Sequence, residues 1–310
     1  MGLFDRLRTG AGDEGADAAA RRAADIERLE RGSIPAAAEQ RIRELGAGGT
    51  AFTSGLSVGD FALAHGRGVR PVCQVMGSSV YQVGWQSYPF GGGWGSALST
   101  ELTQLTQAWN TARRLALGRL EEEARLAGCH AVVDVTFESR RHEFLSGEIE
   151  IVVNGTAVHL ADARADARPV LTDLSMPDYE LLRRGGYEPV GVVASTSVFY
   201  VVPGYRTRRA TGSFMGWAGN QELTDFTQGV YEAREMALGR ATNQAERLGA
   251  GGMVGVQIDH DIHTREVDQN NSKRTDLIIT FHVLGTAIAP HGEHQPVDPQ
   301  MIVRQGAPTR

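Results

Sequence analysis

Apolar residues recur at helical spacing in two long segments of the chain. They stand three and four positions apart from Leu102 to Ala127, and again from Leu223 to Leu248. This spacing places them on one face of an α-helix. Gly128 and Gly249 follow the two segments and are suited to end the helices. Because alanine dominates both apolar faces, we expect each helix to lie close against the surface it covers.

Segments with β-strand composition flank both helices. Each helix is preceded by one segment rich in Val, Thr and aromatic residues and followed by two such segments that a polar turn joins. These segments are 72–82, 131–138 and 148–158 around the first helix, and 190–202, 253–263 and 276–288 around the second. One helix covers only one face of such a sheet. The sequence therefore predicts that the second face of each sheet is left open by its own module. Duplication and oligomerisation can both bury such a face, and we expect that a lone chain cannot bury it.

The two helix-and-strand units also match each other residue by residue. Leu56-Ser57 corresponds to Leu174-Ser175 at an offset of 118, and Glu101-Leu102-Thr103 corresponds to Glu222-Leu223-Thr224 at an offset of 121. Fixed self-similarity of this kind indicates a duplication. The predicted fold class is α+β, with two tandem β-α-β-β modules at residues 50–160 and 168–290. In each module a long helix packs on a small, antiparallel-rich sheet.

Glycines stand at the same mid-helix position of both modules, Gly118 and Gly239. A glycine there costs about 1 kcal/mol relative to alanine. The pair predicts a close approach of another backbone, although inheritance from one ancestral module explains it equally well.

The segments outside the two modules are predicted to be an N-terminal extension, a linker and a C-terminal tail. Residues 1–49 form an extension, with a flexible tether at 9–20 followed by a short helical pair at 21–31 and 35–45. Residues 161–167 form a linker, and the proline-containing tail at 291–310 is expected to be disordered. The first eight residues place Leu3, Phe4 and Leu7 on one edge beside two arginines, which suits a membrane surface, a docking peptide or a frayed terminus.

Composition narrows the possible functions. The chain has 310 residues, is 41% hydrophobic and carries a formal net charge of −6. It lacks the long apolar run of a membrane-spanning segment and the basic face of a nucleic-acid-binding protein. No secretory signal is visible, so we expect a cytoplasmic protein. Lys273 is the only lysine and therefore the only candidate for lysine chemistry.

Candidate metal ligands gather on the second hairpin. Strand alternation puts Asp259, Asp261 and His263 on the face away from the helix, and His282 lies on the same face of the partner strand. A turn centred near Gln269-Asn270 would place Asp259 opposite Thr280 and beside His282. Two carboxylates and two imidazoles can bind a divalent ion such as zinc, nickel or copper. A solvated polar face or a subunit contact explains the same pattern. The first module has no histidine at these positions.

Other candidate sites are weaker. Cys73 and Cys129 are far apart in sequence and replaced in the second module, which favours buried packing over a thiolate site. Glycine-rich loops precede both helices and hold four aromatic residues, Phe90, Trp94, Phe214 and Trp217. Such loops can cradle an anion, but neither matches a phosphate-binding motif, and aromatic anchors on a neighbouring subunit explain them as well.

The second module and, more loosely, the first resemble a known family. The segments 231–238, 244–250 and 253–259, with sequences YEAREMAL, QAERLGA and MVGVQID, are similar to the YbjQ family, a group of small bacterial proteins often labelled "putative heavy-metal-binding". The resemblance implies a dodecin-like β-α-β-β module that assembles into pentameric rings, and it implies no established activity. Family members usually carry one module, so the tandem arrangement here departs from that pattern.

Three functional hypotheses follow. The first is a non-enzymatic protein that assembles into a ring-like homo-oligomer and acts as a scaffold or binds a ligand. The second is a metal-handling protein that uses the second hairpin. The third is a hydrolase-type enzyme in the groove between the modules, although no signature of nucleophilic or metal-dependent catalysis is present.

Overall fold

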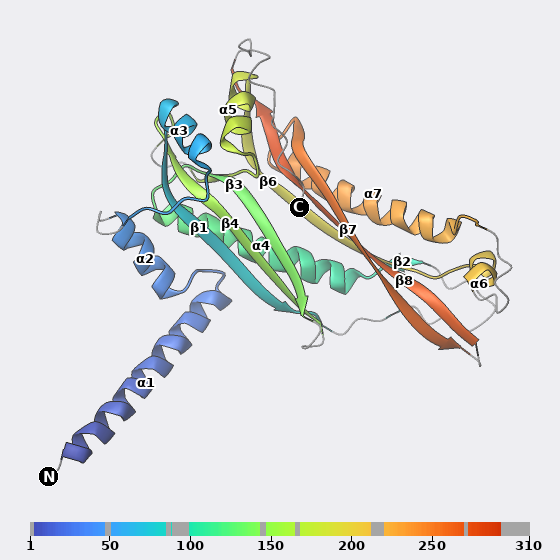
Figure 1. Ribbon diagram of the computed structural model, residues 1–310, viewed down its shortest axis with the longest axis horizontal. Coiled ribbons are helices and arrows are strands. Elements are labelled where there is room, and N and C mark those ends of the chain that lie inside the picture. Colours follow the sequence, from blue (N-terminus) through green and yellow to red (C-terminus); the bar gives the residue numbers. More distant parts are fainter. Residues whose placement is uncertain are drawn as a thin grey trace.

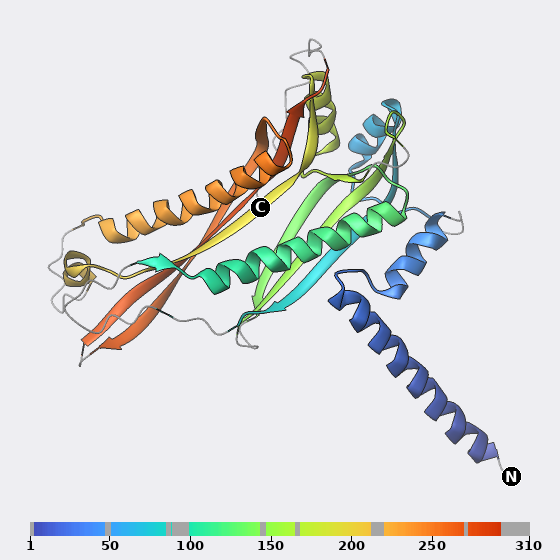
Figure 2. The same cartoon turned by 180° about the vertical axis from the view of Figure 1, so that it is seen from behind.

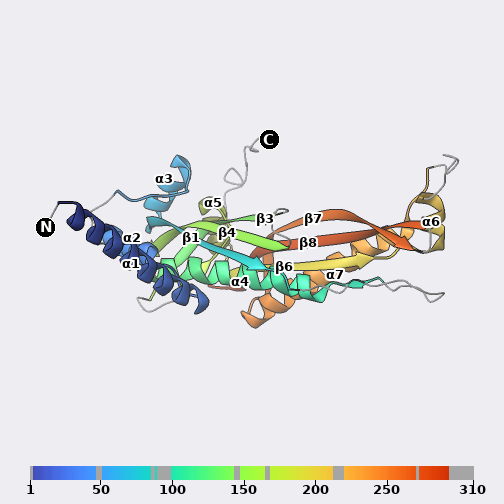
Figure 3. The ribbon, with the colours of Figure 1, turned by 90° about the horizontal axis from the view of Figure 1, so that it is seen from below.

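The computed structural model describes residues 3–46, 51–84, 88, 99–142, 147–164, 168–211, 220–269 and 272–292. Its fold is α+β. Two helices lead the chain, α1 (Leu3–Glu30) and α2 (Ala36–Gly46). Figure 1 shows α1 extending away from two sheets, each of which lies against a long helix. In the view from below, α1 and α2 lie at one end of the elongated molecule and α6 (Tyr205–Thr211) lies at the other (Figure 3).

The first sheet, sheet A, has four strands in the order β1-β4-β3-β5. Three of them are long and antiparallel, β1 (Val69–Gln82), β3 (Ala131–His142) and β4 (Glu148–Leu160). The short β5 (Val170–Leu171) pairs in parallel with β3. Helix α4 (Thr103–Leu126) covers one face and buries its alanines there. The shorter α3 (Val58–Gly66) and α5 (Met176–Arg184) pack at one end of the sheet.

The second sheet, sheet B, has the order β2-β6-β8-β7. Its long strands are β6 (Tyr187–Val201), β7 (Gly252–Gln269) and β8 (Ser272–Pro290), and α7 (Thr224–Arg247) covers one face. The two-residue β2 (Thr100–Glu101) leads directly into α4. The hydrophobic patterns thus predicted the helices and long strands to within a few residues, except for the hairpin β7–β8, which is longer at its turn.

Helix α4 lies between the two sheets and contacts both. Its buried side chains share one core with Val198 and Tyr200 of β6 and Ile278 of β8, which lie on the face of sheet B opposite α7. Figure 2 shows α4 and α7 from behind, running beside each other. The expectation that a lone chain cannot bury the second face of each sheet was therefore wrong for sheet B. Helix α4 of the same chain covers that face, because its side chains contact sheet A on one side and sheet B on the other.

Sheet A does keep an open face. On its side away from α4, the side chains of Met76 and Val80 are 47% and 64% exposed. Strand β7 is also largely exposed, with Val256, Ile258 and Ile262 all at 40% or more. Unburied apolar groups on a sheet face and on an edge strand are features that association with another protein surface can remove from water.

Two local expectations differ from the structure, and a third agrees with it. Residues 9–20, expected as a flexible tether, lie within α1, consistent with the strong helix propensity of Ala18, Ala19 and Ala20. A Cβ added at Gly118 or Gly239 would meet nothing within 4 Å, so neither glycine marks a close backbone approach. Gly128 and Gly249 do follow their helices with positive φ, as expected of residues that end a helix.

Candidate anion-binding groove between α4 and α7

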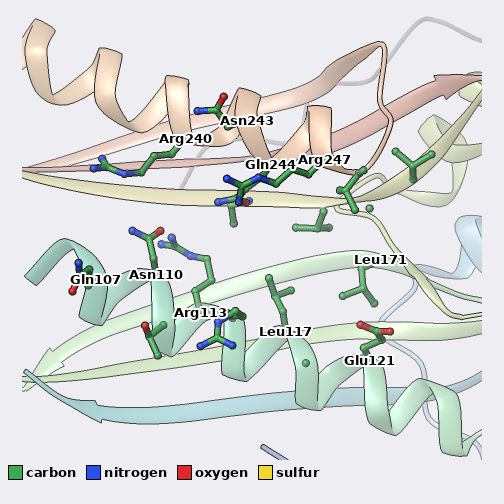
Figure 4. Close-up of a pocket in the computed structure, with 18 of the residues that line it drawn as sticks. Gln107, Asn110, Arg113, Leu117, Glu121, Leu171, Arg240, Asn243, Gln244 and Arg247 are labelled. Carbon is green, nitrogen blue, oxygen red and sulfur yellow. The ribbon is translucent and has the colours of Figure 1, made fainter. Parts of the chain in front are cut away.

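A groove of about 990 Å³ lies between α4, α7 and the adjoining part of β6. Figure 4 shows the side chains of α4 and α7 facing each other across it. Its apolar lining comes from Leu117, Leu171 and the start of β6. A volume of this size is within the range that holds a small organic molecule.

Side chains from both helices bond to the edge of β6 beside the groove. The amide of Asn110 donates to the backbone carbonyl of Thr196 (2.9 Å) and accepts from its backbone N–H (3.0 Å). From the other helix, Gln244 Oε1 accepts the backbone N–H of Ala194 (3.3 Å). These amides replace part of a missing neighbouring strand, and they fix the positions of both helices relative to β6.

The groove is rich in arginine. Five arginines and two glutamates are among its lining residues: Arg113, Arg114, Arg168, Arg240, Arg247, Glu101 and Glu121. Both glutamates are paired, Glu101 with Arg240 at 2.6 Å and Glu121 with Arg168. Within the described residues no acidic partner is found for Arg114 or Arg247. The groove therefore has an excess of positive charge although the whole chain is acidic.

Arg113 is the most buried of these arginines, with 6% of its surface exposed. Its Nη2 lies 3.3 Å from Nδ1 of His282 on β8, while its Nη1 is buried and has no hydrogen-bond partner in the described part of the chain. Burial lowers the pKa of Arg113 to about 10, so the guanidinium is still protonated at neutral pH. A buried donor without an acceptor is costly, and an anionic ligand would supply the acceptor.

Arg240 repeats this feature on the other wall, because its Nη1 is also buried and finds no hydrogen-bond partner among the described residues. Arg119 stands at the corresponding position of α4, on the offset of 121 found in the sequence. Its guanidinium donates to three backbone carbonyl oxygens, those of Ser33, Ser78 and Leu29. In the first half of the chain, α1, the connection after it and β1 thus supply oxygen acceptors, and in the second half Arg240 lines the groove instead.

The predicted metal ligands are only partly brought together. His263 Nε2 and Asp261 Oδ2 are 3.1 Å apart on the exposed strand β7, and Asp259 pairs across the sheet with His282. The turn lies one position later than expected, so Asp261, not Asp259, stands opposite Thr280.

His282 has a different environment from the other three residues. Its Nδ1 lies 2.9 Å from Thr196 Oγ1, and its ring contacts the Trp109 ring edge-on at 4.9 Å between centroids. Burial, and then the charge of Arg113, lower its pKa to about 4. A neighbouring guanidinium disfavours a cation at this nitrogen. Among the described residues, no three His, Cys, Asp or Glu side chains form a group that could hold a metal ion. The four-residue metal site stays a prediction.

The cysteines, the aromatic loop residues and the two chain ends were the other candidates from the sequence. Cys73 and Cys129 are free and buried, and burial raises the pKa of both thiols, that of Cys129 to about 12. The aromatic residues Phe90, Trp94, Phe214 and Trp217 lie outside the described residues, as do the side chains of Leu3, Phe4 and Leu7 and the tail from 293 onward. None of the described helices has the length and hydrophobicity needed to cross a membrane.

Sequence reasoning did not find the arginine groove. Only the Arg113-Arg114 doublet and the recurring arginines of the two helices gave a signal, and surface arginines are common. The groove lies between the two halves, where the enzyme hypothesis places an active site. Its described lining residues include no histidine, cysteine, aspartate, serine, lysine or tyrosine.

The fold and the groove define an α+β protein in which two helix-covered sheets enclose a cationic site. Comparison with known proteins then gives the family. The chain is 34% identical over 259 residues to "Encapsulin nanocompartment protein Rv1762c" of Mycobacterium tuberculosis, covering 81% of this chain and 91% of that protein. The chain belongs to the same family as this mycobacterial protein.

A shorter part of the chain matches the family recognised from the sequence. The YbjQ family model, described as "Putative heavy-metal-binding", matches residues 66–161, which lie in the first half of the chain. The resemblance expected from the sequence was strongest in the second half, at residues 231–259, which this match does not include. The "UPF0145 protein TTHA1944" of Thermus thermophilus is 42% identical over 64 residues, which cover 21% of this chain and 54% of that protein. No solved structure shows significant similarity to the chain.

Proposed function

We propose that this chain is a non-enzymatic, self-associating protein that binds an anionic small molecule in the groove between α4 and α7. The observation that supports this most directly is the buried guanidinium of Arg113, whose Nη1 has no acceptor in the part of the chain that the structure describes. Arg240 presents a second such nitrogen, and Arg114 and Arg247 add exposed positive charge at the groove. Phosphate and carboxylate groups are the ligands that guanidinium groups bind best.

The absence of catalysis belongs to the same proposal. The groove presents arginines, side-chain amides and hydroxyls of threonine, which bind and orient a ligand. Both of its glutamates are engaged in ion pairs. Such a lining favours retention of an anion over its chemical conversion.

Isothermal titration calorimetry tests the groove, with inorganic phosphate, pyrophosphate and citrate as probes. We expect at least one probe to bind, and the double variant Arg114→Gln/Arg247→Gln to weaken it about tenfold or more, since charged hydrogen bonds contribute about 1.5–3 kcal/mol each. Arg125→Gln is the matched control, because Arg125 belongs to the same helix but pairs with Glu122 outside the groove. Failure of all three probes to bind, or equal affinity in the double variant, would refute the proposal.

The proposed self-association rests on exposed apolar groups and on the relative. Met76, Val80 and Ile258 are each more than 40% exposed, which suits surfaces that meet another protein. The related mycobacterial protein is named as an encapsulin nanocompartment protein. We propose that this chain likewise acts in such a compartment. We also propose that it forms a closed, ring-like homo-oligomer. The YbjQ resemblance implies a ring of five subunits. Light scattering on the full chain should give a mass several times 33.4 kDa. A mass equal to that of one chain would overturn this part.

We propose further that the two halves are tandem copies of one dodecin-like module. Several paired features support this. Ser57 and Ser175 cap α3 and α5 with the same bond to an aspartate N–H three residues on, and the bulges of β3 and β7 place Asp134 and Gly255 at positive φ. Such bulges are usually conserved between related structures.

Divalent metal binding is a second proposed property. It is favoured by the contact between His263 and Asp261 and by the description of the family that matches residues 66–161.

A further inference from the structure

Two short segments of the chain precede α3 and α5 and have the same local hydrogen bonds. We call residues 52–56 the first leader and residues 170–174 the second leader. Each leader bonds to a threonine on a central strand, the first leader to β4 of sheet A and the second leader to β8 of sheet B. Gly55 N donates to Thr156 Oγ1 at 3.0 Å, and Asp173 N donates to Thr286 Oγ1 at 3.1 Å. The next bond also recurs, from Leu56 N to Ser54 Oγ (3.1 Å) and from Leu174 N to Thr172 Oγ1 (3.2 Å).

The second leader has an additional partner, the outer edge of β3. It runs parallel to this strand, with Ala131 opposite Val170 and Val132 opposite Leu171. Four backbone bonds join them: Val170 N to His130 O, Thr172 N to Val132 O, Val135 N to Thr172 O and Asp134 N to Leu174 O, at 2.9–3.1 Å. This contact links the second half of the chain to the first.

Strand β7 has the same edge as β3. Both strands carry a bulge at corresponding positions, where Asp134 has a φ of 55° and Gly255 has a φ of 65°. Before the bulge, Val133 pairs with Thr156 and Val254 pairs with Thr286. In the part of the chain that the structure describes, no strand pairs with the outer edge of β7. The result is visible in burial, since Val135 is 2% exposed and its counterpart Val256 is 40% exposed.

The first leader is the corresponding unpaired partner. Phe52 is 53% exposed, and residues 51–53 and 55 lie on the surface, whereas Leu171 and Thr172 of the second leader are buried. Corresponding apolar residues on the sheet faces also differ in burial between the two halves of the chain. Val80 on the open face of sheet A is 64% exposed, and its counterpart Val198, which α4 covers on sheet B, is fully buried.

We propose that the first leader of a second copy of this chain pairs, in parallel, with the outer edge of β7 at residues 251–256. The predicted bonds are those of the second leader on β3, shifted by the offsets of the repeat. Ser54 N donates to Met253 O, and Val256 N donates to Ser54 O. A long strand edge with unpaired N–H and C=O groups favours such pairing.

This contact joins different surfaces of the two copies, so every added copy offers a new β7 edge. It closes a ring if the rotation permits. In this arrangement the outer face of α7 of one copy, where Tyr231 is 60% exposed, lies toward the open face of sheet A around Val80 of the second copy. Within one chain, α4 covers sheet B in the same way. The inference rests on the proposed self-association and names the surface that carries it.

Cross-linking tests the predicted register. Phe52 and Gly252 correspond to Val170 and Ala131, which are direct partners in the chain. The variant Phe52→Cys/Gly252→Cys, oxidised at low concentration, should give a ladder of disulfide-linked oligomers on a non-reducing gel. The control Phe52→Cys/Thr264→Cys keeps the first cysteine and moves the second along β7, and it should give no ladder. A ladder in the control, or none in the test variant, would contradict the register.

Light scattering separates failure of this interface from failure of self-association. We expect Val256→Lys to lower the mass of the wild-type oligomer at least twofold, because it places a charge at the predicted contact. Ile262→Lys, a similar change on the same strand, lies beyond the contact and should leave the mass unchanged. If the wild type and Val256→Lys form equal oligomers, this interface is wrong and self-association stands. If the wild type itself has the mass of one chain, both are wrong.

Discussion

The guanidinium of Arg113 on α4 and the imidazole of His282 on β8 are in contact, with Nη2 and Nδ1 separated by 3.3 Å. Helix α4, which covers sheet A, is thereby bonded to the face of sheet B that points away from α7. A neutral imidazole accepts this hydrogen bond, and a protonated imidazole would face a like charge in a buried place. The contact therefore makes one connection between the two sheets sensitive to protonation.

The first prediction concerns acid stability. The unfolded His282 has a pKa near 6.5 and the folded residue one of about 4, chiefly through burial. The unfolded state binds more protons in this window, so stability falls as the pH drops from about 6.5 toward 4, by up to about 3 kcal/mol. Denaturant titrations of the wild type and His282→Gln should show a smaller pH dependence in the variant. Equal slopes in the two proteins would contradict the assignment.

The second prediction concerns the packing of α4 on β1. A Cβ at Gly77 would stand 1.9 Å from the backbone oxygen of Ala116 and 2.7 Å from the backbone N of Leu120. Backbone atoms cannot move aside, so Gly77→Ala should destabilise the protein by about 2 kcal/mol or more. The control Gly239→Ala adds a methyl group where nothing lies within 4 Å and should stabilise α7 by up to about 1 kcal/mol. Thermal unfolding measures both, and a tolerated Gly77→Ala would show that the helix is not held this closely.

The third prediction concerns a buried ion pair in sheet B. Arg274 forms two bonds to Asp276, Nε to Oδ1 at 2.6 Å and Nη2 to Oδ2 at 2.7 Å, and the hydroxyl of Tyr200 donates to Oδ2 at 2.6 Å. Asp276 is fully buried and Arg274 is 5% exposed. Asp276→Asn leaves a buried positive charge uncompensated and should cost about 3 kcal/mol or more of unfolding free energy.

The pair of Lys273 with Glu266 provides the comparison for this prediction. Its side chains are 74% and 70% exposed, so Glu266→Gln should change stability little. Chemical denaturation of both variants decides the matter. Equal losses of unfolding free energy in the two variants would mean that burial does not determine how much Asp276 contributes to stability.

The fourth prediction concerns metal binding. Titration calorimetry with zinc, nickel and copper should detect an ion bound through Asp259, Asp261, His263 and His282. The variant His263→Ala/His282→Ala should lose that binding, because it removes both imidazole ligands. His65→Ala removes a histidine from α3 instead and should bind as the wild type does. Unchanged affinity in the double variant would exclude the site.

Much of the fold was predictable from residue patterns. The spacing of apolar residues from Leu102 to Ala127 matches α4, and the matched positions of the two halves indicated the same order of elements in each. Helices and strands are local, and their periodicities of about 3.6 and 2 residues show in a single sequence. One register was displaced because a turn can shift by a residue without changing the hydrophobic pattern, which moved Asp259 to a position opposite His282.

By itself, the sequence determined the elements and the polarity of their faces. Only the tertiary structure decided which surface covers which. An apolar face does not specify its partner, since hydrophobic burial has no direction. Sheet B is therefore covered by α4 of the same chain, while Val80 on sheet A is left exposed. The arginine groove was also beyond the sequence, because Arg113, Arg168 and Arg240 come from three separate segments that only the packing of the two helices brings together.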